Sequence, residues 1–259
     1  MSMEDELFHH FRPDERMFVE RVLDWTSRAE ERYQSVLTPF LNPREQRIVD
    51  MLVRRSPDLH VTFDGGFSNA ERRRARIAPQ YMDEEDFGLA FFMVSSLSPD
   101  GKLKHPDVLG SLLGLGMKRD KIGDLLSHAD GYQIIIASDM ADYIPLQLTH
   151  VGKLTIRISE MDRNQLISPI IETTEMSISV VSMRLDAVAS DAFRISRSKV
   201  VTLIKNGRCQ VNWKTTENPA EPVKEGDVLS LRGSGRTKVG EIQGRSKKGR
   251  LLVSLIRYK

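Results

Sequence analysis

The spacing of apolar residues changes near residue 58, and this change constrains the fold more than any other feature. Before it, apolar residues recur every three or four positions, which places them on one side of a helix: Phe18, Val22, Trp25, Ala29, Tyr33 and Val36. A second helix is expected to begin at Asn42-Pro43, a capping residue followed by proline, and to end before Pro57. Residues 1–57 are therefore predicted to form a helical N-terminal unit.

From residue 58 onward, short β-rich runs alternate with helical ones, which predicts an α/β sandwich over residues 58–165. The expected strands are Leu59 to Phe63, Phe87 to Ser95, Tyr132 to Ala137, Leu154 to Ile158 and Met176 to Ser182. The expected helices are Pro106 to Leu113, Lys118 to Leu126 and Met140 to Val151. Residues 166–182 are predicted to be a linker and a strand, and the whole chain an α+β multidomain protein.

Charge is distributed unevenly along the 259 residues. Residues 1–182 contain 21 Lys and Arg against 29 Asp and Glu, a net charge of −8, whereas residues 183–259 contain 17 against 7, a net charge of +10. Such a concentration of positive charge on a short segment is typical of a domain that binds a polyanion, nucleic acid above all.

The basic segment 183–259 has its own pattern of elements. Leu185, Val188, Ala189, Ala192 and Phe193 predict one helix, and Ser196 is expected to cap a second, with its hydroxyl bonded to free amides. Asn206-Gly207 should end that helix, because glycine adopts a left-handed conformation without steric cost. A strand from Cys209 to Trp213 and a final hairpin around Ser246 to Gly249 are expected to follow.

Four motifs in this segment, in order, resemble the S-four RNA-binding domain, which is named after a small-subunit ribosomal protein. They are Met183-Arg184-Leu185-Asp186, Ile195 to Val200, Leu203 to Arg208 with Val211-Asn212, and Val223 to Asp227. The resemblance implies an S-four-type α/β domain at residues 183–259 whose helix pair binds folded RNA through its shape and backbone.

Two motifs upstream resemble the YlmH family of bacterial cytoplasmic proteins: His105 to Gly110 and Gly116 to Asp124. With the S-four motifs, this resemblance covers the whole chain, and it implies an RNA-recognition-like central domain. It also implies binding to ribosomal RNA of the large ribosomal subunit, a role in the quality control of stalled translation complexes, and an association with cell-division genes. It leaves open whether transfer RNA is contacted and which protein binds the acidic N-terminal half.

RNA phosphates favour arginine for bidentate contacts and lysine for point charges, and each contact releases counterions. The expected RNA-binding residues are Arg184, Arg194, Ser196, Arg197, Ser198, Lys199, Lys205, Asn206, Arg208, Asn212 and Lys214, with a second contact at Arg72, Arg73, Arg74 and Arg76. Some alternatives stay open. Arg197 lies near the apolar stripe, so its stem can cover the core instead of contacting RNA. Asp186 can support the first turn of its helix or pair with a nearby arginine as readily as it can contact a ligand. Trp213 is a candidate for base stacking, although strand packing is favoured.

An RNA-modifying enzyme is the main alternative function. Arg184-Leu185-Asp186 is similar to the catalytic Arg-Leu-Asp of pseudouridine synthases, but here Ala187 to Ser190 follow on an amphipathic helix where the synthases have Thr-Ser-Gly. A methyltransferase would need a glycine-rich turn after its first strand, a setting that Gly114-Leu115-Gly116 and Asp64-Gly65-Gly66 do not have. We therefore expect no catalytic residue and no cofactor.

Other chemistries have little support in the sequence. The six histidines lack metal-ligand spacing, and the single cysteine, Cys209, is expected to be a small core residue. The acidic N-terminus and the short apolar runs predict a cytoplasmic protein without a membrane span. A protein–protein adaptor, with its acidic half bound to a partner, remains a further alternative.

Overall fold

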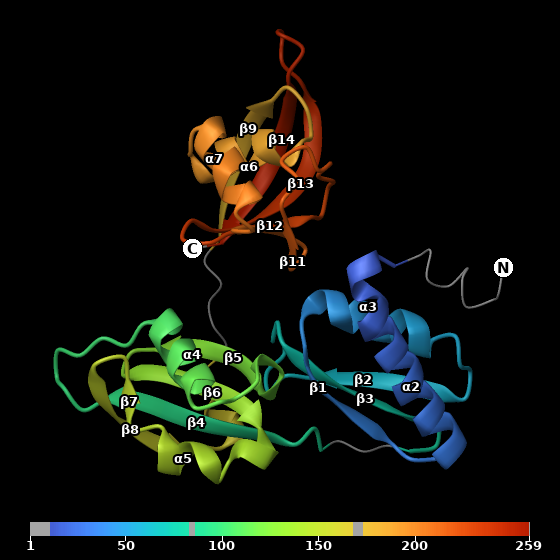
Figure 1. Ribbon diagram of the computed structural model, residues 1–259, viewed down its shortest axis with the longest axis vertical. Helices are drawn as coiled ribbons and strands as arrows, with labels where there is room; N and C mark the ends of the chain where they lie inside the picture. The colour runs from blue at the N-terminus through green and yellow to red at the C-terminus, as the bar shows by residue number, and fades with distance from the viewer. Residues whose placement is uncertain (1–10, 83–85, 168–172, 259) are drawn as a thin grey trace. The chain divides into compact units, whose positions relative to one another are not determined.

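The computed structural model describes residues 11–82, 86–167 and 173–258. The chain divides between residues 169 and 170 into two compact units (Figure 1), here called unit 1 and unit 2, and both combine helices with antiparallel sheets. The expected α+β multidomain class is confirmed. Within the segment expected to be a linker, residues 168–172 lie outside the described part of the chain, as do residues 1–10.

In the first part of unit 1, two helices pack on a three-stranded sheet of order β1-β3-β2. Its elements are a short 3-10 helix (Pro13–Glu15), α2 (Arg16–Arg32), β1 (Val36–Leu41), α3 (Pro43–Val53), β2 (Leu59–Asp64) and β3 (Arg73–Pro79). The Asn42 side chain accepts hydrogen bonds from the amides of Arg44 and Glu45, so α3 begins where the capping pattern predicts.

The sheet changes the expectation for the N-terminal unit. Helix α2 ends at Arg32 because Tyr33 adopts a left-handed backbone with φ of 51°, and Val36, which fits the helical spacing, begins strand β1 and pairs with Ile77. Strands β2 and β3 complete that sheet. The unit expected to be helical over residues 1–57 therefore continues into a sheet that ends at Pro79.

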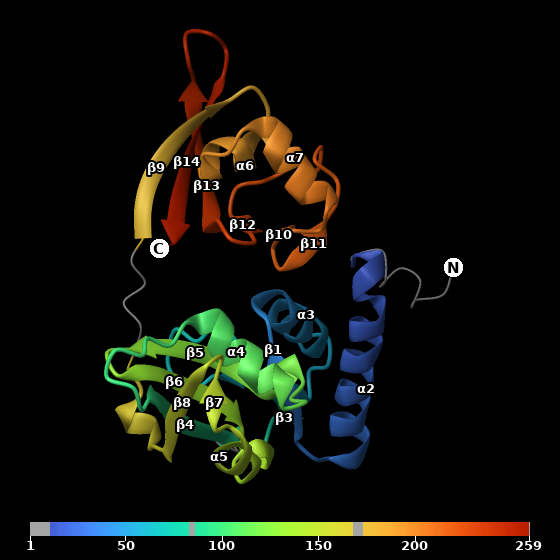
Figure 2. The ribbon, with the colours of Figure 1, turned by 60° about the vertical axis from the view of Figure 1, so that its left-hand side comes forward.

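The second part of unit 1 is a five-stranded antiparallel sheet of order β5-β6-β4-β8-β7, with α4 and α5 packed against it (Figure 2). Its elements are β4 (Leu89–Ser96), α4 (His105–Gly114), a 3-10 helix (Arg119–Lys121), β5 (Ile122–His128), β6 (Gly131–Ala137), a 3-10 helix (Ser138–Met140), α5 (Tyr143–Gln147), β7 (His150–Val151), β8 (Leu154–Glu160) and a 3-10 helix (Arg163–Gln165).

Of the helical segments expected in this part, one is a strand and another is much shorter than expected. The segment 118–126 is mostly strand β5, in which Ile122 pairs with Ile136 at the sheet edge, and the segment 140–151 contains only the five-residue α5 before strand β7. Ile122 and Leu126 are both buried, and their spacing of four residues fits a helix as well as a strand. Pairing with β6, which lies further along the chain, decides in favour of the strand.

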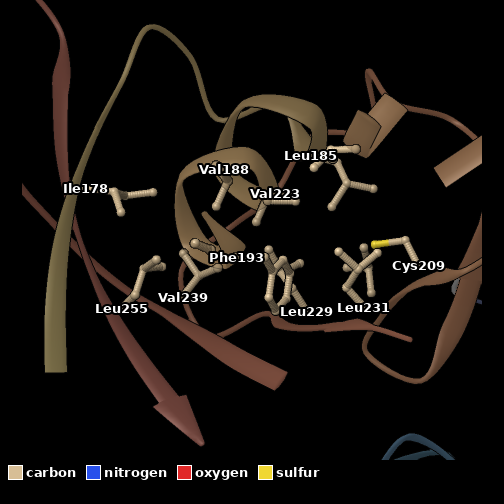
Figure 3. Close-up of a cluster of buried hydrophobic side chains, with 14 of the residues drawn as sticks. Ile178, Leu185, Val188, Phe193, Cys209, Val223, Leu229, Leu231, Val239 and Leu255 are labelled. Atoms are coloured by element: carbon tan, nitrogen blue, oxygen red, sulfur yellow. The ribbon is translucent and has the colours of Figure 1, made fainter. Parts of the chain in front are cut away.

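Unit 2 places α6 and α7 on a six-stranded sheet of order β11-β10-β12-β13-β14-β9, and side chains from both layers form one core (Figure 3). Its elements are β9 (Thr173–Val180), α6 (Leu185–Phe193), α7 (Arg197–Lys205), β10 (Cys209–Val211), β11 (Lys214–Thr216), β12 (Val228–Leu231), β13 (Gly235–Arg245) and β14 (Leu251–Tyr258). Because β9 pairs along β14, with Val180 opposite Leu251, this unit begins before residue 183.

A substitution at Gly123 in β5 would test the contact between the two sheets of unit 1. A Cβ atom at this position would lie 2.8 Å from the ring of Phe40 on β1 and 3.2 Å from the carbonyl oxygen of Ile135. We expect Gly123→Ala to lower the free energy of unfolding by about 1–3 kcal/mol, measured by calorimetry. Gly110→Ala is the control, because nothing lies within 4 Å of that Cβ and the change should stabilise α4. Equal stability of the two variants would contradict the tight contact.

Candidate nucleic-acid interface

A buried carboxylate joins the N-terminal ends of α6 and α7. Asp186, in the first turn of α6, is 4% exposed and accepts hydrogen bonds from two arginines. Arg184 donates from Nε to Oδ1 at 3.1 Å and from Nη2 to Oδ2 at 3.2 Å, and Arg197 donates from Nε and Nη2 to Oδ2 at 3.1 and 2.9 Å. We call these three residues the Asp186 clamp.

The electrostatics of the clamp favour a charged Asp186. Burial raises the pKa of Asp186, but hydrogen bonds from Arg184 and Arg197 and their positive charges outweigh it, so the pKa lies below its ordinary value. The same hydrogen bonds raise the pKa of Arg184. The two arginine side chains are still 44% and 55% exposed, so each guanidinium is fixed on one side and faces solvent on the other.

Most of the other expected contacts lie on the surface of unit 2. The exposed candidates on or beside α6 and α7 are Arg194, Ser196, Ser198, Lys199, Lys205, Asn206 and Arg208. Val200 and Ile204 face the core, so α7 has one buried side and one polar side. Gly207 follows the helix with φ of 66°, as expected from the sequence. Ser196 occupies the N-cap position, but its hydroxyl makes no cap hydrogen bond and lies 3.4 Å from that of Ser198.

Asn212 and Lys214 differ from these surface residues. The Asn212 amide donates to Asp227 Oδ1 at 2.7 Å and its Oδ1 accepts from the Val228 amide at 2.9 Å, which ties the β10–β11 turn to β12. Asp227 in turn accepts from the amide of Lys224. Asn212 therefore has a structural role, and Lys214 is half-buried at the start of β11.

The four arginines expected as a second contact do not form an exposed patch. Arg74 donates to the carbonyl oxygens of Thr38 and Gly88, both at 2.8 Å. Arg76 is 8% exposed and donates to Ser35 and to the carbonyl of Asp86. Arg73, which is half-buried, donates to the carbonyl oxygens of Ala70 and Ser68. These guanidinium groups are engaged inside unit 1, which corrects their expected place at the surface.

Arg72 connects the two sheets of unit 1 through the motif Gly116 to Asp124. Its guanidinium donates to the carbonyl oxygens of Ile122 and Phe40 at 2.9 and 3.0 Å, and Asp124 accepts from the backbone amides of Glu71 and Arg72. Burial lowers the pKa of Arg72 and raises that of Asp124. Ile122 and Asp124 of this motif therefore have a structural role, and no signal in the sequence showed which carbonyls Arg72 would bind.

Two side chains that bear on enzyme chemistry, those of Asp186 and Cys209, are buried. Asp186, the counterpart of the synthases' aspartate, is buried and held by two arginines. Burial raises the pKa of the Cys209 thiol to about 11, so this cysteine is protonated at neutral pH. Among the described residues no His, Cys, Asp and Glu side chains gather as metal ligands, and His9 and His10 lie outside that part. No described helix is long and apolar enough to cross a membrane.

Comparison with known proteins places three family models along the chain. A model described as "YlmH, N-terminal" matches residues 14–82, one described as "Putative RNA-binding domain in YlmH" matches residues 82–165, and the S4 domain matches residues 183–229. The boundary at residue 82 agrees with the end of the first sheet, and the S4 match contains the Asp186 clamp.

Two relatives extend the comparison. The chain is 39% identical, over 98% of its own length and 99% of the relative's, to "Ribosome-associated protein quality control protein P2" of Bacillus subtilis. A solved structure, "Cell division protein ylmH from Streptococcus pneumoniae", is 26% identical with a TM-score of 0.54, and the match covers 61% of this chain and 98% of that one. With three family models in order and a relative matched along almost its entire length, the chain belongs to the YlmH family.

Proposed function

We propose that this protein binds ribosomal RNA of the large ribosomal subunit through the outer side of α6 and α7, and that it acts as a binding factor and not as an enzyme. The observation that carries the proposal is the Asp186 clamp, which holds two half-exposed arginines at the ends of adjacent helices. The proposed contacts are Arg184, Arg194, Arg197, Lys199, Lys205 and Arg208, with Ser196 and Ser198 beside them.

The clamp suits phosphate recognition. A guanidinium held on one side by a carboxylate loses little conformational freedom when its other side meets a phosphate, and arginine donates two parallel hydrogen bonds to such a group. The lysines on α7 add point charges, and contacts with several phosphates release counterions together. A surface of this kind recognises folded RNA by its backbone.

The ribosomal part of the proposal draws on the relatives. The Bacillus subtilis relative is named as a ribosome-associated quality control protein, and two of the three family models describe domains that fit RNA binding. On the basis of this name, the proposal extends to a function in the cytoplasm, in the quality control of stalled translation complexes. Transfer RNA is a further candidate partner on the same surface, because it presents the same phosphate backbone.

The first test removes the lysines that lie outside the clamp. We expect Lys199→Ala with Lys205→Ala to weaken binding to purified large subunits and to make the slope of log affinity against log salt shallower by about 1.4 to 1.8. Binding would be measured by co-sedimentation across a salt series. Lys238→Ala with Lys247→Ala removes the same charge from the β13–β14 hairpin and is the control. Equal losses in the two double variants would show that the contact is not specific to α7.

The second test separates the orientation of the arginines from their charge. Asp186→Asn removes one negative charge, which by itself favours RNA binding, but it also removes the ionic acceptor of Arg184 and Arg197. We therefore expect weaker binding to large subunits and a loss of about 1.5–3 kcal/mol in the stability of unit 2. Asp191→Asn makes the same charge change on α6, where the carboxylate is 43% exposed and 4.0 Å from Arg250. Should Asp186→Asn bind as tightly as Asp191→Asn, the clamp would have no part in recognition.

A further inference from the structure

The turn between β10 and β11 has an unusual composition. Val211 pairs with Lys214, so the connection contains only Asn212 and Trp213, and both adopt left-handed backbone conformations, with φ of 50° and 63°. Two-residue hairpin turns of this kind favour Asn followed by Gly, because a side chain on a left-handed residue is sterically strained. Asn212 fits the pattern, whereas Trp213 stands where glycine is preferred.

Packing in the core does not account for this tryptophan. Trp213 is absent from the core of unit 2 and from the partly buried side chains packed against it, as far as residues 173–258 are described. Its ring is half-buried, and the guanidinium carbon of Arg236 lies 5.7 Å from the ring centroid. A strained, bulky aromatic outside a core is the kind of feature that persists at binding sites.

We propose that Trp213 is a stacking platform for an unpaired RNA base. An indole can stack on any nucleobase through its aromatic face, and Arg236 makes a cation–π contact with this ring. Lys214, next in the chain, carries a positive charge that would attract the phosphate of the same nucleotide. The proposal rests on the proposed function, because it assumes that unit 2 binds RNA.

The stacking contact would define the kind of RNA that is bound. Phosphate contacts from α6 and α7 accept any folded backbone, whereas a base can stack on a side chain only when it has left its own helix. The preferred ligand would therefore be a structured RNA with an unpaired, splayed-out nucleotide beside a helical segment. A fully paired helix would contact the cations and leave Trp213 without a base.

The experiment compares two labelled RNA probes, a stem-loop with an unpaired loop and a fully paired duplex of the same stem. Affinity for the full chain would be measured by fluorescence anisotropy at one salt concentration, for the wild type and for Trp213→Phe, Trp213→Leu and Trp213→Gly. We expect the leucine and glycine variants to lose about 5- to 150-fold in affinity for the stem-loop. The phenylalanine variant should retain most of that affinity, and duplex binding should change little in all three.

Each other outcome has a defined meaning. If leucine or glycine at position 213 preserved the wild-type preference for the stem-loop, or if all variants lost affinity equally for both probes, Trp213 would only support the fold. A wild type that bound both probes equally would overturn stacking while leaving phosphate binding intact. A wild type that bound neither probe would overturn the proposed function as well. Lys199→Ala with Lys205→Ala is the reference, because it should weaken both probes.

Discussion

The pairing of Asp186 with Arg184 and Arg197 is the interaction on which the proposed RNA-binding surface depends. A carboxylate that is only 4% exposed needs charged partners, because burying a charge without them costs several kcal/mol. The two partners come from the starts of different helices, so one carboxylate fixes both the helix pair and the direction of two guanidinium groups. In the proposed function, the three side chains that join the two helices also take part in recognition.

The sequence predicts those parts of the fold that local patterns determine. The cap at Asn42, the apolar stripe of α6 and the left-handed Gly207 each depend on residues a few positions apart. Strands β1 and β5 were missed because their existence depends on partners far along the chain. The spacing of Val36 and Ile122 fits a helix in the sequence. In the structure both residues lie in strands, because Val36 pairs with Ile77 and Ile122 pairs with Ile136.

In the candidate site, too, the sequence predicts what depends on local patterns and not what depends on distant partners. The segment 183–259 could be identified by charge and motif order. The sequence left open whether Asp186 pairs with an arginine, and it did not identify Arg197 as a partner. Charge alone says nothing about burial, so the sequence could not show that the four arginines expected as a second RNA contact, Arg72, Arg73, Arg74 and Arg76, donate to backbone carbonyls. Their partners, such as Thr38 and Ile122, lie some 30 to 50 residues away in sequence. Trp213 fits a strand by alternation, and its left-handed turn has no local signal beyond Asn212.

The two kinds of cation in this protein follow from the chemistry of their side chains. The planar guanidinium of arginine donates in several fixed directions, so arginines bind carbonyls between the sheets of unit 1 and the buried carboxylate of unit 2. Lysine carries a compact, strongly hydrated charge, and Lys199 and Lys205 are exposed on α7. A count of charges along the chain therefore predicts the class of ligand. The hydrogen bonds that each arginine makes within the protein decide whether it is available to that ligand.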